Sequence, residues 1–139
     1  MRFLFVVSFL YFTFGSIHAQ SEILGRWLTA EKDAHIEIYK NGEEYEGKIV
    51  WLDEPTRPDG SIPRDDNNPD ESLRERPIMN MVMLSGFTYS RGQYRNGSIY
   101  DARNGKTYNS KMWLDDNNTL MMRGYLGPFY RTVELTRVQ

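Results

Sequence analysis

Beyond residue 19, short stretches of alternating apolar and polar residues follow one another along the chain, separated by turn-forming residues. Alternation with a period of two is typical of β-strands with one buried face. It predicts eight strands, at Ile23–Ala30, His35–Lys40, Tyr45–Leu52, Ile78–Ser90, Tyr94–Asp101, Thr107–Leu114, Leu120–Leu126 and Phe129–Val138. Eight short strands at this spacing indicate an all-β fold, an antiparallel up-and-down barrel.

Turn chemistry supports this reading between several strands. Asn41-Gly42 and Asn104-Gly105 are strong hairpin signals, because both residue types tolerate positive φ. Asn96-Gly97 is either a turn or a bulge. The side-chain alternation predicts two sets of interior residues, namely Tyr45, Gly47, Ile49 and Trp51 on one strand and Met121, Arg123 and Tyr125 on another.

The first and last predicted strands carry a complementary pair of residues. Gly25-Arg-Trp27 begins the first strand, and Arg137 lies near the end of the last. We expect the Trp27 ring to plug one end of the barrel, with the Arg137 guanidinium across its face as a cation–π contact.

One long connection, residues 53–77, interrupts the strand pattern. Asn68 is a good N-cap, Pro69 suits the first helical position, and Pro77 ends the segment. The sequence therefore predicts a two-turn helix at Pro69–Glu75, over or beside one barrel mouth. Long connections in compact domains are usually functional or disordered, and this one is a candidate partial lid.

Residues 1–19 have the features of a signal peptide, with Arg2, the apolar run Phe3–Phe14, and a small residue, Ala19, at the expected cleavage site. The apolar run is shorter than the ~20 residues of a membrane-spanning helix. We therefore expect cleavage after Ala19 and a periplasmic or secreted protein, with one domain at residues 20–139. Without its leader, which carries one basic residue, the chain has a net charge of −3 in place of −2. This mild charge indicates neither nucleic acid nor an anionic membrane surface as a partner, and we expect a monomer.

Three sequence blocks carry a family resemblance: 66–77, 97–108 and 120–127. Together with Gly25, Trp27 and 47–51, they closely resemble the bacterial family known as domain of unknown function 2147. That family resembles the calycin group, which includes lipocalins and fatty-acid-binding proteins. The resemblance implies an eight-stranded barrel and no established activity. The chain departs from the family pattern at Ala102-Arg103, where a proline is expected, and at Asn80, where a glycine is usual.

Catalytic and metal chemistry find little support. The chain has no cysteine and, after the leader, a single histidine, His35, which is more typical of a surface or cross-strand partner than of a base or zinc ligand. Asp66, Asn68 and Asp70 have the spacing of the first ligands of a calcium loop. The glycine and the final glutamate of such a loop are missing, so the helix cap explains these residues better. We expect no metal, no cofactor and no catalytic residue.

Arginine and tyrosine side chains are the best candidates for ligand contacts, because together they can hold a carboxylate. The candidates are Arg123, Tyr125, Arg131, Tyr108, Arg74 and Arg76. For the last two, a structural role is favoured, in which they pair with Asp65, Asp66 or Asp101 and fix the long connection. Arg123, if it faces inward, needs a carboxylate from the protein or from a ligand.

The sequence thus favours an exported barrel that binds a small amphipathic or apolar molecule, such as a fatty acid, with Arg123 and Tyr125 orienting its polar head. One alternative is a filled barrel that acts as a structural or interaction module. It requires Trp27, Trp51, Tyr45, Met121 and Tyr125 to meet inside. A second alternative is a hydrolase with paired carboxylates from the long connection, which needs two acids of separated pKa in one cleft.

Overall fold

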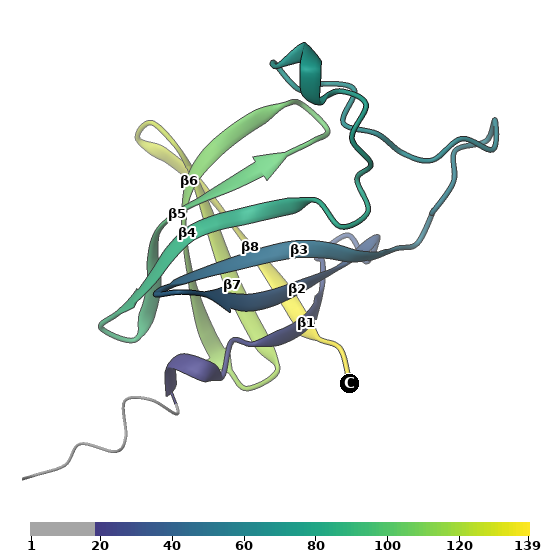
Figure 1. Ribbon diagram of the computed structural model, residues 1–139. Coiled ribbons are helices and arrows are strands. Elements are labelled where there is room, and N and C mark those ends of the chain that lie inside the picture. The colour runs from purple at the N-terminus through teal and green to yellow at the C-terminus, as the bar shows by residue number, and fades with distance from the viewer. Residues whose placement is uncertain (1–18) are drawn as a thin grey trace, which may run out of the picture.

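The computed structural model describes residues 19–139 and shows eight antiparallel strands closed into one barrel (Figure 1). Each strand pairs with its neighbours in the chain, and the first pairs with the last, so the predicted up-and-down barrel is confirmed. The predicted leader, apart from Ala19, lies outside the described residues. The strands are β1 Gly25–Leu28, β2 Ala34–Asn41, β3 Glu44–Leu52, β4 Val82–Ser90, β5 Gln93–Asp101, β6 Lys106–Asp116, β7 Thr119–Leu126 and β8 Phe129–Arg137.

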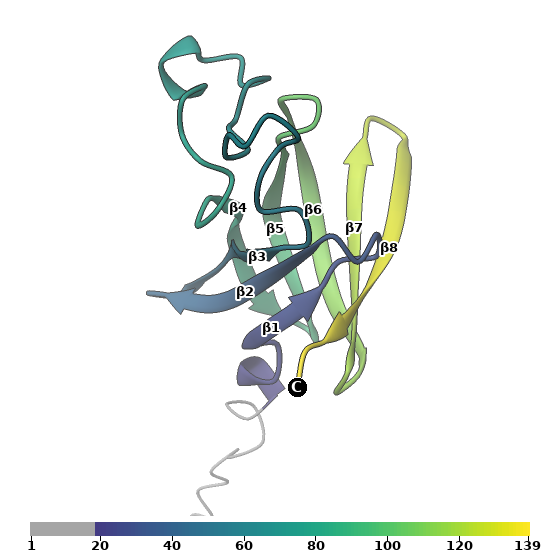
Figure 2. The ribbon, with the colours of Figure 1, turned by 90° about the vertical axis from the view of Figure 1, so that its right-hand side faces the viewer.

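The barrel has two different ends, which the antiparallel topology defines. The connections β1–β2, β3–β4, β5–β6 and β7–β8 lie at one end, here called the mouth (Figures 1 and 2). The other three hairpin turns and the C-terminus lie at the opposite end, called the base. Every residue that contacts a bound molecule at the mouth must therefore come from the upper halves of the strands or from those four connections.

Trp27 and Arg137 close the base as the sequence predicts. The Trp27 side chain is fully buried, and the guanidinium carbon of Arg137 lies 4.2 Å from its ring centroid. The indole Nε1 donates a hydrogen bond to the Ile23 carbonyl at 2.9 Å. Arg137 also donates to the carbonyls of Leu24 and Asn117, at 3.0 and 2.6 Å. These bonds hold the residues just before β1 under the barrel.

The seam between β1 and β8 is the shortest of the eight strand pairings. Only Trp27 with Arg137 and Leu28 with Thr136 are in register there, whereas β7 and β8 pair over eight residues. One further backbone hydrogen bond, from the Val138 N–H to the Arg26 carbonyl at 2.9 Å, lies at the same end. The two strands are therefore hydrogen-bonded to each other only near the base.

The interior set predicted on β3 is correct for Tyr45, Gly47 and Ile49 but wrong for Trp51. The register of β2 with β3 shifts between His35 and Ile36, so Val50 is an extra residue and the alternation changes phase. Trp51 consequently faces outward and packs on His35, with ring centroids 4.4 Å apart. His35 is thus the cross-strand partner that the sequence indicated.

The interior set predicted on β7 is also wrong. Leu120 and Met122 are buried in the core, so Met121, Arg123 and Tyr125 share the outer face of the strand. Either phase gives a regular alternation. The observed one buries two fully apolar side chains and leaves the guanidinium in contact with water, which avoids the cost of an unpaired buried charge.

The helix in the long connection is shorter than predicted. A single 3₁₀ turn, η1 Glu71–Leu73, replaces the helix expected at Pro69–Glu75, and Asp70 is its N-cap in place of Asn68. The Asn68 side chain accepts the backbone N–H of Asp70 at 2.9 Å, which makes a local turn before the helix begins. Because the Asn68 side chain is engaged in this turn, it does not cap a helix at Pro69, and the helix begins only at Glu71.

The lower half of the barrel is filled by large side chains. They come from seven strands and the segment before β1, and they form one apolar cluster: Ile23, Trp27, Ile38, Tyr45, Phe87, Tyr94, Met112 and Leu120. Asn96-Gly97 contributes to this packing as a bulge in β5, where a side chain at Gly97 would come within 2.4 Å of the Phe87 ring. The filled half stops well below the mouth.

Candidate functional site

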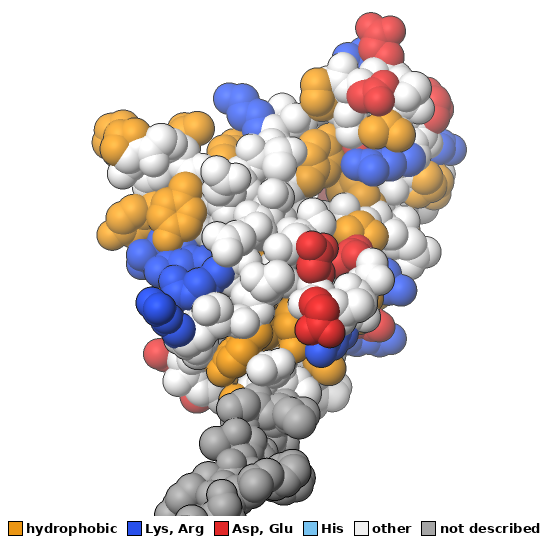
Figure 3. Space-filling model, turned by 60° about the vertical axis from the view of Figure 1, so that its left-hand side comes forward, with side chains coloured by type: hydrophobic (Ala, Val, Ile, Leu, Met, Phe, Trp, Pro, Cys, Tyr) orange, Lys and Arg blue, Asp and Glu red, His pale blue; other side chains and the backbone are white. Residues whose placement is uncertain are grey.

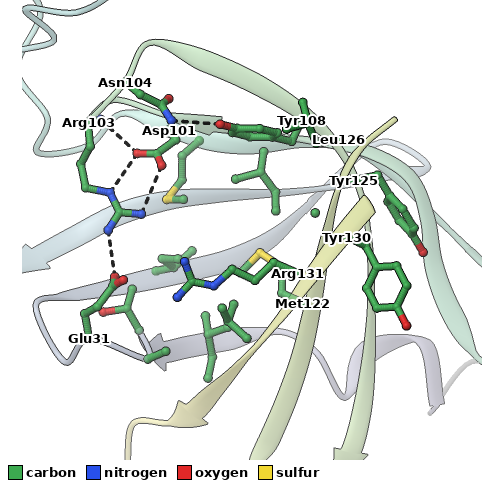
Figure 4. Close-up of a pocket in the computed structure, with 18 of the residues that line it drawn as sticks. Glu31, Asp101, Arg103, Asn104, Tyr108, Met122, Tyr125, Leu126, Tyr130 and Arg131 are labelled. Atoms are coloured by element: carbon green, nitrogen blue, oxygen red, sulfur yellow. Dashed lines mark hydrogen bonds and ion pairs between the residues drawn. The ribbon is translucent and has the colours of Figure 1, made fainter. Parts of the chain in front are cut away.

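The upper half of the barrel contains a cavity of about 480 Å³ (Figure 4). Its lower wall is apolar and comes from five strands: Ile36, Met83, Ile99, Met122, Val133 and Leu135. Its rim is mixed: polar residues lie on one part of it, namely Thr29, Glu31, Asp101, Arg103, Asn104, Tyr108 and Arg131, and Leu126, Phe129 and Tyr130 of the β7–β8 hairpin lie on another. A largely apolar chamber with a few polar groups is the usual construction of a small-molecule site.

A smaller space of about 240 Å³ adjoins this cavity on the side of β2 and β3. Both are lined by Met83, Ile99, Tyr108 and Arg103, so these side chains form the partition between them. Ile78 and Met81, which follow the long connection, close the smaller space from above.

Arg103 links opposite sides of the mouth. From the β5–β6 turn its guanidinium binds Asp101, with Nε 3.0 Å from Oδ1, and reaches Glu31 of the β1–β2 turn at 3.1 Å (Figure 4). The pair with Glu31 is largely exposed, so it contributes at most about 1 kcal/mol. Such a bridge orders the mouth without locking it.

Glu31 and Asp101 are two carboxylates in one cleft, which bears on the hydrolase alternative. Burial alone would raise the pKa of Asp101, but the hydrogen bonds and charge of Arg103 lower it below the ordinary value. Both acids bind the same guanidinium, and the lowered pKa of Asp101 is the opposite of what a general acid requires. The acids of the long connection do not join them, because Asp65 binds Arg76 and Asp66 binds Arg57.

Arg131 is the candidate ligand residue that the fold brings into the cavity. It lies on the inner face of β8, two residues from Val133, and its side chain reaches into the cavity (Figure 4). Among the described residues its guanidinium has no ion pair and no hydrogen-bond partner. Tyr108 also lines the cavity, and its hydroxyl accepts a hydrogen bond from Asn104 Nδ2 at 2.9 Å. The Tyr108 proton is thereby left for a second partner.

Arg123 and Tyr125 do not orient anything inside the barrel, because both side chains lie on its outer face. Arg123 donates from Nε to the Thr132 hydroxyl at 2.8 Å and lies 4.2 Å from the Tyr130 ring centroid. Tyr125 packs beside Tyr130 at a centroid distance of 6.2 Å; it borders the cavity, but its ring is turned away from the chamber (Figure 4). The guanidinium therefore finds its partners among aromatic rings and water.

Arg74 and Arg76 hold the long connection in place, which is the structural role favoured for them. Arg76 binds the fully buried carboxylate of Asp65 through Nε and a terminal nitrogen, both at 2.8 Å. Arg74 donates to the Asn68 carbonyl at 2.7 Å. Asp65 also accepts hydrogen bonds from the Tyr100 hydroxyl on β5 and from Asn68. We call Asp65 with its three partners the loop clamp.

The long connection lies beside the mouth and not across it (Figures 1 and 2). None of residues 53–77 lines either cavity. Asn67 donates to the carbonyls of Ala102 and Arg103, and a side chain at Gly105 would meet the Asn67 carbonyl oxygen at 1.9 Å. The segment is thus fastened to the β5–β6 turn, and the structure gives no support to a lid.

The loop clamp is expected to make stability depend on pH in two windows. Burial opposes ionisation of Asp65, but hydrogen bonds from Tyr100, Asn68 and Arg76 outweigh it and hold its pKa below the ordinary 3.8. This contribution is present above about pH 4 and is lost at lower pH. Burial and the Asp65 hydrogen bond raise the pKa of Tyr100 from 10.0 to about 12. That contribution is present below pH 10 and is lost as the pH rises to about 12.

Urea denaturation midpoints, measured across the pH range, test both the loss of stability in acid and the loss in base. The Asp65→Asn variant should show a shallower loss in acid than the unmodified protein, and Tyr100→Phe a shallower loss in base. Unchanged profiles in both variants would contradict this role of the clamp.

The sequence reasoning missed Gly124, which lies on the cavity wall beside Tyr108 of the neighbouring strand β6. A Cβ at this position would be 3.8 Å from the Tyr108 Cβ and 3.9 Å from Ile99 Cδ1. The signal was a glycine inside a strand pattern, which often marks a place where something approaches the backbone closely.

Residues 19–139 contain neither a cluster of metal-ligand side chains nor a helix that could cross a membrane. No three acidic, histidine or cysteine side chains in this part of the chain are grouped as metal ligands are. No helix within these residues has the length and hydrophobicity to span a bilayer.

A closed eight-stranded antiparallel barrel with a sealed base is a lipocalin-like fold. The chain belongs to the family described as uncharacterized protein conserved in bacteria (DUF2147), whose sequence model matches residues 25–137. The fold is similar to that of protein HP1028 from the human pathogen Helicobacter pylori, described as belonging to the lipocalin family. The two chains are 23% identical with a TM-score of 0.72, over 84% of this chain and 83% of the other. No curated protein matches the chain. The family resemblance predicted from the sequence blocks is confirmed.

Proposed function

We propose that this protein binds a small apolar or amphipathic molecule in the upper half of its barrel. The observation that carries the proposal is the cavity of about 480 Å³, which falls within the ~300–1,000 Å³ range of ligand pockets. Of the five large residues that a filled barrel requires inside, Trp51, Met121 and Tyr125 face outward. That count favours a ligand chamber over a filled structural module.

The polar rim supports an amphipathic ligand over a purely apolar one. The apolar body would rest against Ile99, Met122 and Val133, and the polar head would lie at the mouth. Arg131 can donate to an anionic or neutral oxygen there, and the Tyr108 hydroxyl can donate alongside it. Arg103 is less suited, because two carboxylates already occupy it.

The compartment is part of the same proposal. The leader features of residues 1–19 support a periplasmic or secreted protein. A carrier there would shield an apolar molecule from water between its source and its destination. The direct test is native mass spectrometry of the protein purified from its host, together with uptake of the fluorescent probe N-phenyl-1-naphthylamine. Absence of both a bound molecule and probe uptake would refute the proposal.

Gly124→Val is expected to weaken probe binding by about tenfold or more, because its methyl groups extend from the wall into the chamber. The first added carbon makes ordinary contacts of 3.8 and 3.9 Å, and valine suits a strand, so the melting temperature should change by only a few degrees. Fluorescence titration measures the effect.

Met121→Val is the matched control for this variant. It places the same residue on the outer face of the same strand and should leave probe affinity unchanged. Equal binding by Gly124→Val and the unmodified protein would show that the probe does not enter this chamber.

A further inference from the structure

The tip of the β7–β8 hairpin exposes more apolar surface than any other described part of the chain. Leu126, Phe129 and Tyr130 are 63%, 74% and 60% exposed, whereas the next most exposed large apolar residue, Ile62, is at 41%. Gly127 and Pro128 form the turn between them. The hairpin turn lies at the mouth (Figure 2), and the residues on both sides of it border the cavity. A protein surface rarely exposes such a contiguous group without a partner.

A basic and aromatic collar lies directly below this tip on the outer face of the barrel. Arg123 on β7 and Lys111 on β6 are cross-strand partners, and Trp113 lies 5.1 Å from the former and 5.5 Å from the latter. Neither cation has a carboxylate partner among the described residues. Figure 3 shows hydrophobic side chains at this upper corner with Lys and Arg side chains directly beneath them. The nearest acid on the same face of β8 is Glu134, two residue pairs further toward the base.

From the tip downward the side chains are first apolar and then aromatic and basic, which is the order in which a bilayer surface offers acyl chains, interface and headgroups. Apolar side chains at the tip can enter the acyl boundary, aromatic rings suit the interface, and the cations below reach headgroup phosphates. Anionic lipids would strengthen the contact, because each basic group near the surface is attracted to them. The net charge of the chain is negative, so the whole molecule gives no hint of this contact, and only the local distribution does.

A second copy of the chain is a poorer occupant. A symmetric contact places the same patch on both partners, so it would bring Arg123 and Lys111 of one copy against their equivalents. Like charges that meet without carboxylates oppose association. A membrane with anionic headgroups supplies the missing negative charge.

We propose that the β7–β8 tip docks this barrel on the surface of bilayers that contain anionic lipids. Leu126, Phe129 and Tyr130 also line the cavity, so docking places its opening at the membrane. A molecule could then pass between the acyl region and the chamber with little exposure to water. The docking itself does not depend on the proposed ligand, and each can be refuted separately.

Vesicle flotation tests the docking directly. The purified protein is mixed with vesicles of phosphatidylcholine alone or of phosphatidylcholine with phosphatidylglycerol. We expect binding to the mixed vesicles that weakens as salt is added, because part of the attraction is electrostatic. The double variant Leu126→Ser with Phe129→Ser should bind at least about tenfold less, since it removes most of the insertable surface.

Two further variants test whether vesicle binding requires the tip and the basic residues below it, or whether any exposed apolar surface is sufficient. Ile62→Ser with Val82→Ser removes exposed apolar residues elsewhere and should bind like the unmodified protein. Lys111→Gln should weaken binding to mixed vesicles only. Circular dichroism confirms that each variant is folded. The proposal is overturned if the protein does not float with mixed vesicles, if the tip variant binds as well as the control, or if the protein dimerises through this tip in sedimentation experiments.

Discussion

Trp27→Ala is expected to lower the free energy of unfolding by about 3–5 kcal/mol, the usual cost of removing a large aromatic from a core. The indole is fully buried, its Nε1 is hydrogen-bonded, and Arg137 lies against its face. Its loss opens the base and deprives Arg137 of a packing surface at the seam between β1 and β8. Urea denaturation followed by circular dichroism measures the change.

Trp51→Ala is the matched control for this experiment. Sequence alternation predicts both tryptophans inside, but the register shift in β2–β3 turns Trp51 outward against His35. Its replacement should cost about 1 kcal/mol or less, because the side chain lies on the outer face, is 38% exposed and leaves no cavity in the core when it is removed. Arg137→Lys should fall between the two, since lysine keeps the charge but cannot reproduce the bonds to several carbonyls. Equal costs for the two tryptophans would contradict the described interior.

Asp65→Ala is expected to release the long connection, with a loss of about 2–4 kcal/mol. Breaking a buried pair usually costs about 3–5 kcal/mol, and Arg76 reduces this cost because its side chain is 36% exposed and can return to water. The Tyr100 hydroxyl and the Asn68 amide lose the same acceptor. Hydrogen exchange should show faster exchange throughout residues 53–77, and trypsin should cut there first.

The neighbouring acid provides the control for the clamp. Asp66 is exposed and pairs with Arg57 at the surface, so Asp66→Ala should change stability by about 1 kcal/mol or less. Barrel strands should keep their protection in both variants, because residues 53–77 line neither cavity. Global unfolding of Asp65→Ala, or identical exchange in the two variants, would show that the clamp does not act locally.

Features fixed by local chemistry were predictable from the sequence. Turn residues and alternation located all eight strands, and Trp27 with Arg137 identified the sealed end. The pairing of Arg76 with Asp65 was also among the anticipated contacts. Each of these depends on residue types that tolerate few other environments.

The face that a strand presents was harder to predict, because a single extra residue reverses it. One bulge moved Trp51 outside, and on β7 both phases alternate equally well, so Arg123 was placed inside. The choice depends on which side chains the other strands present, and one strand's pattern does not contain that information. Arg131 entered the site because Val133 and Leu135 fixed the phase of β8.

The short seam between β1 and β8 has a consequence for which molecules the chamber can hold. Above Leu28 and Thr136 no residue pair joins these strands, although both border the cavity through Thr29 and Val133. From β4 to β8 each strand pairs with the next over five or more residue pairs, so widening the barrel there would break many hydrogen bonds. The seam between β1 and β8 has two pairs, so separating these strands would break the fewest. We therefore expect the barrel to widen most easily at this seam, and the chamber to admit molecules larger than its volume of about 480 Å³.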